Sequence, residues 1–120
     1  AINDTHGHAA GDRVLARAVA AFRAELSGAE LLGRLGGEEF AALLPRAGAD
    51  AAVEAGERLR LAAEHLVVEN DHGAAIPVTT SVGAAVREAG ATADASELLR
   101  RADEALYAAK EGGRNQVRLA

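Results

Sequence analysis

The residues of this chain best suited to chemistry are Gly36-Gly37-Glu38-Glu39-Phe40. Short apolar segments typical of β-strands lie on both sides, so we expect the pentapeptide to form the turn of a β-hairpin. Two glycines let the backbone reverse and leave no side chain in the way of a bulky ligand. The adjacent carboxylates repel each other, but they could hold Mg²⁺, which prefers carboxylate oxygens and keeps positions open for phosphate. The alternative is an ordinary Gly-Gly turn with two solvated acids.

Length and composition restrict the class of protein. The chain has 120 residues, enough for one domain with its own core, and 49% of them are apolar. One Tyr and two Phe are its only aromatic residues, so we expect a core of Leu, Val and Ala. A net charge of −5 argues against a nucleic-acid binder, which needs a basic face. No apolar run is long enough to cross a bilayer and cysteine is absent, so we expect a cytoplasmic domain without membrane contact.

The elements that must position the acidic hairpin follow from hydrophobic periodicity and from turn residues. In chain order we expect a helix from near Asp12 to Ser27, a hairpin over 30–44, a helix capped by Asp50, a strand over 76–86, a helix opened by Asp94 and closed by Gly112-Gly113, and a strand over 116–119. An antiparallel sheet covered by helices on one face suits this order. The expected fold class is therefore α+β.

Three local patterns add detail to this scheme. Asp94 and Glu97 have the spacing of a capping box. The polar segment 69–75 is expected to form a loop or a small extra hairpin. One face of the strand over 76–86 consists only of small residues, which implies close packing or a nearby ligand.

The hairpin motif is one of several blocks that occur together in order and spacing. The blocks are Ile2-Asn3-Asp4-Thr5-His6-Gly7-His8, Gly11-Asp12, Arg34-Leu35-Gly36-Gly37-Glu38-Glu39-Phe40, Thr80-Ser81-Val82-Gly83-Ala84, Ala102-Asp103-Glu104-Ala105-Leu106-Tyr107 and Lys110-Glu111-Gly112-Gly113-Arg114-Asn115. In this combination the chain resembles the GGDEF domains, which are diguanylate cyclases. The resemblance covers residues 1–120 as one domain. It implies a ferredoxin-like, palm-type antiparallel sheet with helices packed on it.

The resemblance also implies an activity, the condensation of two GTP molecules into cyclic di-GMP and pyrophosphate. It makes Glu38 the metal-binding and catalytic carboxylate, with Mg²⁺ (or Mn²⁺) as the cofactor. Glu39 is implied as a second ligand or electrostatic partner. Gly36 and Gly37 would let the α-phosphate approach the backbone. Catalysis of this kind consists mainly of positioning and charge neutralisation.

Four further residues match positions that bind the nucleotide in the family. Asn3 and Asp12 match the guanine readers, since a carboxylate can accept from the N1–H and N2–H groups of guanine. The alternative is that Asn3 stabilises a loop and that Asp12 caps a helix. Lys110 and Arg114 match the triphosphate contacts. Their other explanation is that they complement the negative end of the helix dipole.

The chain departs from the family pattern in two places. In the family, a strand before the Ile2 block supplies an aspartate that shares the metals, and here the sequence begins at Ala1. We therefore expect this first central strand and the N-terminal helix to be missing, and the fragment by itself to be inactive. Family members inhibited by their product carry Arg-x-x-Asp just before the hairpin, where this chain has Ser27 and Glu30. Serine cannot form the bidentate pair of an arginine, so strong product inhibition is not expected.

The alternatives are a non-catalytic GTP-binding regulatory module and a dimerisation module. Joining two GTP molecules needs two loaded domains face to face, so the resemblance implies a homodimer. It also implies an upstream sensory domain in the parent, a bacterial signalling protein. The expected small-molecule partner is GTP.

Overall fold

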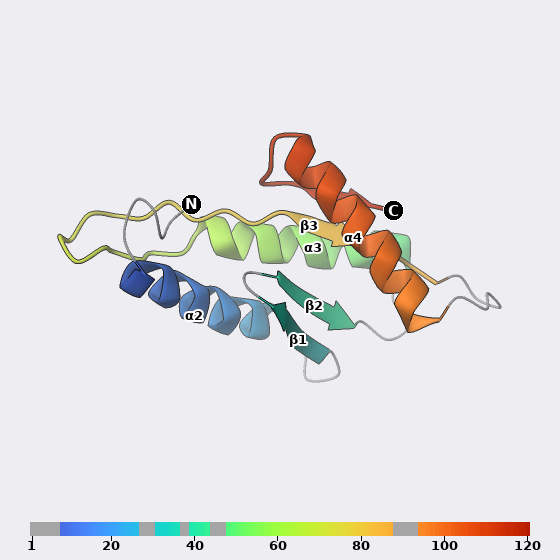
Figure 1. Ribbon diagram of the computed structural model, residues 1–120, viewed down its shortest axis with the longest axis horizontal. Helices are drawn as coiled ribbons and strands as arrows, with labels where there is room; N and C mark the ends of the chain where they lie inside the picture. Colours follow the sequence, from blue (N-terminus) through green and yellow to red (C-terminus); the bar gives the residue numbers. More distant parts are fainter. Residues whose placement is uncertain (1–7, 27–30, 37–38, 44–47, 88–93) are drawn as a thin grey trace.

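A computed structural model describes residues 8–26, 31–36, 39–43, 48–87 and 94–120 of the chain. Its elements are, in order, α2 (His8–Glu25), β1 (Leu31–Gly36), β2 (Glu39–Leu43), α3 (Ala49–Glu64), β3 (Val82–Ala84), α4 (Ala95–Glu111) and β4 (Val117–Leu119) (Figure 1). Among the described residues, no helix combines the length and the hydropathy that crossing a membrane requires.

Helix α2 begins one turn earlier than the sequence predicted. It starts at His8 and contains Ala9 and Ala10, which are strong helix formers and extend the helix back beyond Gly11. Asp12 therefore lies within the helix and is not its N-cap, which corrects the capping alternative. The helix ends at Glu25, close to the predicted end, although Ser27 lies outside the described residues.

The main core forms between α2, α3 and the segment that follows α3. Its buried residues are Ala10, Val14, Ala18, Phe22, Ala63, Val68, Ile76 and Val78. The four residues from α2 recur every fourth position, which brings them to one face of the helix. Leu59 and Leu66 pack against this cluster but remain partly exposed. The core thus contains Ala and Val as expected, and it also contains Phe22 and Ile76.

Helix α3 is also capped differently from the prediction. Its N-cap is Gly48, and no side chain caps the helix there. Asp50 lies in the first turn, where a carboxylate complements the positive end of the helix dipole without capping it. Ala49 favours helix and moves the start back by one residue.

The polar segment after α3 forms a small turn, as expected. Glu69 and Ala75 form an antiparallel bridge. Asn70 holds the turn, because its Oδ1 accepts from the amides of His72 and Ala74 at 2.9 and 3.0 Å. Gly73 has a φ of 77°, a conformation that glycine adopts without strain.

Strands β1 and β2 form the predicted antiparallel hairpin. The register pairs Leu31 with Leu43 at the open end and Gly36 with Glu39 at the closed end. An irregularity lies between Arg34 and Gly36. The predicted stop at Pro45 lies outside the described residues, but β2 ends two residues before it.

Strand β3 is much shorter than the strand predicted over 76–86. It covers only Val82–Ala84 and pairs in parallel with β4, whereas a purely antiparallel sheet was expected. The parallel pairing follows from the intervening helix, because β3, α4 and β4 form a βαβ unit. Burial still alternates from 75 to 79, with Ile76 and Val78 buried and their neighbours exposed. The extended backbone therefore begins as predicted but, within the described residues, has a ladder partner only beside β4.

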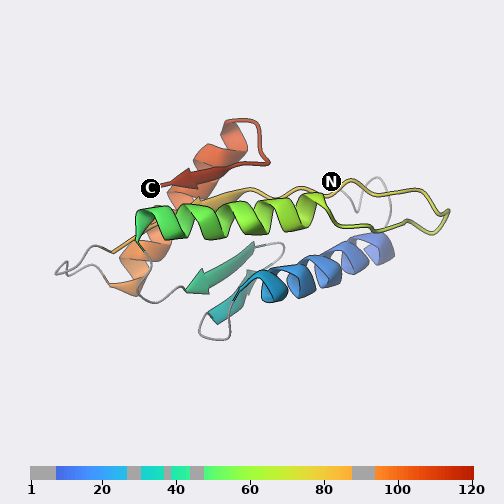
Figure 2. The ribbon, with the colours of Figure 1, turned by 180° about the vertical axis from the view of Figure 1, so that it is seen from behind.

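Helices cover both faces of the β3–β4 pair. A Cβ at Gly83 would lie 2.2 Å from the carbonyl oxygen of Ala102 in α4, so the two backbones touch. On the other face, a Cβ at Gly56 of α3 would lie 2.9 Å from Val117 Cγ1. Accordingly, α4 lies in front of β3 in Figure 1, and α4 lies behind α3 in Figure 2. The small face predicted for this strand is used for close packing against α4.

Within the described residues the strands form two separate pairs, β1–β2 and β3–β4. Helices α3 and α4 pack on the β3–β4 pair. The combination of helices with small sheets confirms the α+β class.

Candidate functional site

The hairpin brings the ends of the acidic motif together. Gly36 is the last residue of β1, Glu39 is the first residue of β2, and the two are paired across the strands. The connection is thus shorter than the predicted five-residue turn and consists of Gly37 and Glu38. Both of these residues lie outside the described part of the chain.

The two residues matched to guanine recognition belong to the N-terminal part of the chain. Asp12 lies in the second turn of α2 and is exposed, so its carboxylate is open to a ligand. Asn3 lies outside the described residues.

The end of α4 places the two residues matched to triphosphate binding. Gly112 is the C-cap, and Gly113 follows with a φ of 115°. The Arg114 amide donates to the Ala109 carbonyl at 2.9 Å, and the Gly113 amide donates to the Lys110 carbonyl at 3.4 Å. These two bonds are those of a Schellman motif, and they confirm that the double glycine terminates the helix.

Beyond the helix the chain keeps an unusual backbone conformation. Arg114 and Asn115 have φ values of 64° and 46°, a region that residues with a Cβ rarely adopt. The side chain of Gln116 donates to the carbonyls of Gly112 and Arg114 at 2.9 and 3.2 Å. Hydrogen bonds of its own backbone and of the Gln116 side-chain amide therefore stabilise the turn internally.

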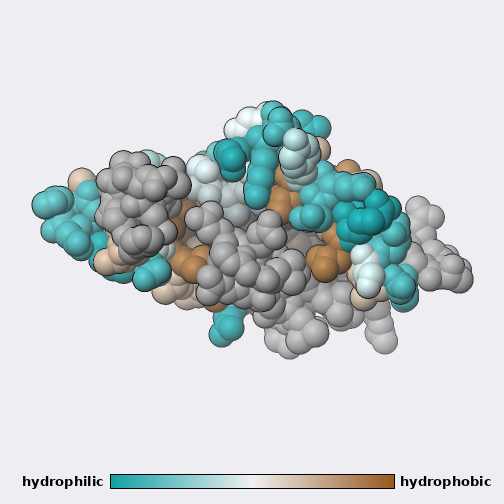
Figure 3. Space-filling view, in the orientation of Figure 1, coloured by the Kyte–Doolittle hydropathy of each residue, from teal (hydrophilic) through white to brown (hydrophobic). Residues whose placement is uncertain are grey.

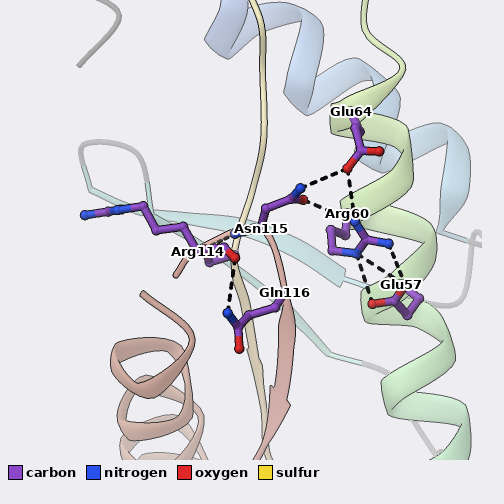
Figure 4. Close-up of polar contacts among 7 residues, drawn as sticks. Glu57, Arg60, Glu64, Arg114, Asn115 and Gln116 are labelled. Carbon is purple, nitrogen blue, oxygen red and sulfur yellow. Dashed lines mark hydrogen bonds and ion pairs between the residues drawn. The ribbon is translucent and has the colours of Figure 1, made fainter. Parts of the chain in front are cut away.

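The two cations differ in their surroundings. Lys110 is half-buried in the last turn of α4, where it can also complement the helix dipole. Arg114 lies beyond the helix and is exposed, and Figure 4 shows its side chain extending away from the neighbouring polar contacts. In the described part of the chain, no hydrogen bond or ion pair joins the side chains of Asp12, Lys110 and Arg114 to one another.

A polar cluster joins this turn to α3 and to the segment before β3. Arg60 Nε and Nη2 donate to Glu57 at 3.0 and 2.9 Å, and Arg60 Nη1 donates to Glu64 at 3.1 Å. Arg60 Nη1 also donates to Asn115 Oδ1 at 3.2 Å, while Asn115 Nδ2 donates to Glu64 at 2.9 Å (Figure 4). The Asn115 amide donates to Ser81 Oγ at 3.1 Å.

The ion pairs of this cluster shift the affinities of their groups for protons. The hydrogen bond from Arg60 lowers the pKa of Glu57 below its ordinary value, and the same bond raises the pKa of Arg60. Arg100 on α4 lowers the pKa of Glu97 in the same way. The lowered pKa values extend the ionised range of both acids toward lower pH.

Sequence reasoning missed Arg60 as a residue of this region. The spacing of Glu57, Arg60 and Glu64 on one helix is a local signal of ion pairing. Nothing local indicates the contact with Asn115, which lies 55 residues further along the chain. Asn115 itself was part of a family block but was given no role.

The described residues contain no group of three or more Asp, Glu, His or Cys that could hold a metal ion. The carboxylates of Glu38 and Glu39 are not among the side chains described. Their chemistry fits a hard cation such as Mg²⁺, because two carboxylates supply anionic oxygens and a bound nucleotide can supply others.

Comparison with known proteins matches residues 1–116 to the family described as diguanylate cyclase, GGDEF domain. Diguanylate cyclase A of Treponema denticola is 40% identical over 118 residues, which are 98% of this chain and 31% of that protein. The chain thus spans about a third of this curated relative.

Solved structures with the same fold include other GGDEF proteins. The diguanylate cyclase SiaD of Pseudomonas aeruginosa, solved in complex with its activator SiaC, is 41% identical with a TM-score of 0.89 over 99% of this chain and 45% of its own. The active GGEEF domain of a diguanylate cyclase from Vibrio cholerae is 31% identical with a TM-score of 0.84 over 98% of this chain and 73% of its own. Sequence blocks, hairpin and fold agree, and the chain belongs to the GGDEF family of diguanylate cyclase domains.

Proposed function

We propose that this domain is the catalytic unit of a diguanylate cyclase, which condenses two GTP molecules into cyclic di-GMP and two pyrophosphates. The observation that supports this most strongly is the hairpin in which Gly36 and Glu39 are paired at the closed end of the acidic motif. The family match over residues 1–116 supports the same function.

The reaction forms a bond from the 3′-oxygen of one GTP to the α-phosphorus of the other and breaks the bond to pyrophosphate. The attacking 3′-hydroxyl loses its proton. A second attack, with the roles of the two nucleotides exchanged, closes the ring and releases the second pyrophosphate. Enzymes of this family need a divalent metal ion, and we assign Glu38 as its ligand, with Mg²⁺ or Mn²⁺ neutralising phosphate charge when bound. Glu39 is a second ligand or an electrostatic partner. Gly36 and Gly37 leave room for the α-phosphate beside the backbone.

The remaining residues bind the nucleotide. Asp12 accepts from the N1–H and N2–H groups of guanine and Asn3 hydrogen-bonds the same base, which rejects adenine. Lys110 and Arg114 contact the triphosphate. The exposure and extended side chain of Arg114 support this role.

The proposed assembly is a homodimer in which two GTP-loaded domains face each other. An upstream sensory domain of a cytoplasmic bacterial signalling protein would control their approach. The solved complex of SiaD with its activator supports control by another protein or domain. Sedimentation of the full-length protein should show a dimer, and a monomer under conditions of turnover would contradict the assembly.

The function is tested with the full-length protein that contains this domain. Incubation with GTP and Mg²⁺ should yield cyclic di-GMP and pyrophosphate. Glu38→Gln should lower the rate by more than about 100-fold, since it removes a proposed metal ligand. Glu54→Gln is the control, because Glu54 lies exposed on α3 and, among the residues that the structure describes, its one ion pair is with Arg58.

The outcomes separate the proposed function from the alternatives. Magnesium-dependent GTP binding without turnover would identify a non-catalytic regulatory module. A dimer with no affinity for GTP would identify a dimerisation module, and the cyclase assignment would be wrong.

A further inference from the structure

The turn that carries Arg114 has a conformation that its own sequence does not favour. Arg114 and Asn115 both have positive φ, and arginine in particular gains nothing from that region. Such a conformation persists only where surrounding contacts determine it. The question is which contacts do so.

The helix end accounts for part of the turn. The Schellman bonds fix the amides of Gly113 and Arg114. They do not reach Asn115, whose amide instead donates to Ser81 Oγ at 3.1 Å. Asn115 thus attaches the turn to the rest of the fold, next to Gln116, whose carbonyl accepts from the Val82 amide at 2.9 Å.

The side chain of Asn115 is fixed from α3. Arg60 donates to its Oδ1 at 3.2 Å, and its Nδ2 donates to Glu64 at 2.9 Å. Arg60 is itself held in place, because Glu57 binds it through two nitrogens and Glu64 binds a third. A guanidinium held in this planar, bidentate way presents its remaining N–H in a fixed direction.

The degree of burial agrees with a structural role for this guanidinium. The side chain of Arg60 is only 17% exposed, although Glu57 and Glu64 are 43% and 41% exposed. A surface ion pair would leave its arginine open to water, where the pair contributes little. Arg60 instead lies between its helix and the turn.

We propose that Arg60 positions Arg114: through Asn115 it fixes the left-handed turn that presents the Arg114 side chain to the triphosphate of a bound guanine nucleotide. This inference rests on the proposed function, because it takes the nucleotide as the ligand of Arg114. Arg60 is a positioning residue and touches no reacting atom.

The chain contains a matched control for this proposal. Arg100 on α4 pairs with Glu97 and Glu104 at the same i−3 and i+4 spacing as Arg60 with Glu57 and Glu64. Its side chain is 56% exposed, and α4 presents a largely hydrophilic surface in Figure 3. Among the described residues it makes no contact with the turn over 112–116.

The experiment compares Arg60→Gln and Arg100→Gln in the full-length protein, alone and combined with Arg114→Ala. Arg60→Gln should raise the KM for GTP by about ten- to hundredfold with kcat changed less than about twofold, because misplacing a binding group weakens ground-state and transition-state binding alike. Arg100→Gln should leave both constants unchanged. In the Arg114→Ala background, Arg60→Gln should add less than about twofold, since residues acting through one another are not additive.

A second variant keeps the test decisive if Arg60→Gln does not fold. Asn115→Gly retains the freedom for positive φ, the backbone amide and the ion pairs of α3, but it removes the side-chain contacts with Arg60 and Glu64. It should reproduce the rise in KM. An unchanged KM in Asn115→Gly would overturn the proposal. Equal effects of Arg60→Gln and Arg100→Gln, or a full Arg60→Gln effect without Arg114, would overturn it too.

Amide hydrogen exchange separates failure of this inference from failure of the proposed function. Arg60→Gln should speed exchange at the amides of residues 114 and 115, whereas Arg100→Gln should not. An unmodified protein without affinity for GTP would contradict the proposed function, and the exchange rates would still decide whether Arg60 holds the turn. Unaltered exchange in Arg60→Gln would overturn the inference in either case.

Discussion

Arg60 and Arg100 have glutamates at the same spacing on their own helices, but they differ in their contacts with the rest of the fold. Each arginine donates to a glutamate three residues before it and to another four residues after it. The side chain of Arg60, which also donates to Asn115 in the turn, is 17% exposed, against 56% for Arg100. Surface pairs of the Arg100 type contribute roughly 0–1 kcal/mol to stability. The role of an arginine thus depends on its tertiary contacts more than on its local spacing.

Inhibition by the product, cyclic di-GMP, also depends on individual residues. By the resemblance to the family, we expect Ser27 and Glu30 to lie where inhibited members have arginine and aspartate. Because serine offers no bidentate donor, added cyclic di-GMP should leave the initial rate of the full-length protein nearly unchanged. The double substitution Ser27→Arg with Glu30→Asp should introduce inhibition. Strong inhibition of the unmodified protein in the same assay would contradict the prediction.

Among the elements, the contact of β3 with α4 allows the least change. A Cβ at Gly83 would lie 2.2 Å from the Ala102 carbonyl oxygen and 2.3 Å from the Leu106 amide nitrogen. Both are backbone atoms, so Gly83→Ala should destabilise the fold by at least about 2 kcal/mol. Gly48→Ala is the control, because nothing lies within 4 Å of its added Cβ, and it should cost less than about 1 kcal/mol. Equal midpoints of urea unfolding for the two variants would show that α4 can move away.

Some elements could be predicted from the sequence because their signals are local. Asp94 caps α4 by accepting from the Glu97 amide at 2.9 Å, and Gly113 ends that helix with positive φ. The start of α2 and the cap of α3 were wrong by a few residues, because alanines before the expected caps continue the helix. The length of β3 could not be predicted, because a strand extends only as far as its partner does.

Across the whole molecule, the elements form an elongated body of 54 × 30 × 22 Å. The core between α2 and α3 is formed by residues 10–78, and the βαβ unit is formed by residues 82–119 (Figures 1 and 2). The candidate residues Asp12, Lys110 and Arg114 were predicted from family blocks. In the structure Asp12 and Arg114 are exposed and Lys110 is half-buried. Arg60 was not predicted, since its link to Asn115 joins segments 55 residues apart.

That separation has a consequence for how the protein comes into being on the ribosome. Asn115 is synthesised after Arg60 and Ser81. The contacts between α3 and the turn can therefore form only when residues 112–116 have emerged. Non-local contacts of this kind form late. We therefore expect the turn that carries Arg114, the proposed triphosphate contact, to form last. Pulse-labelled exchange on stalled nascent chains should find α3 protected before the turn is complete, and simultaneous protection would contradict this order.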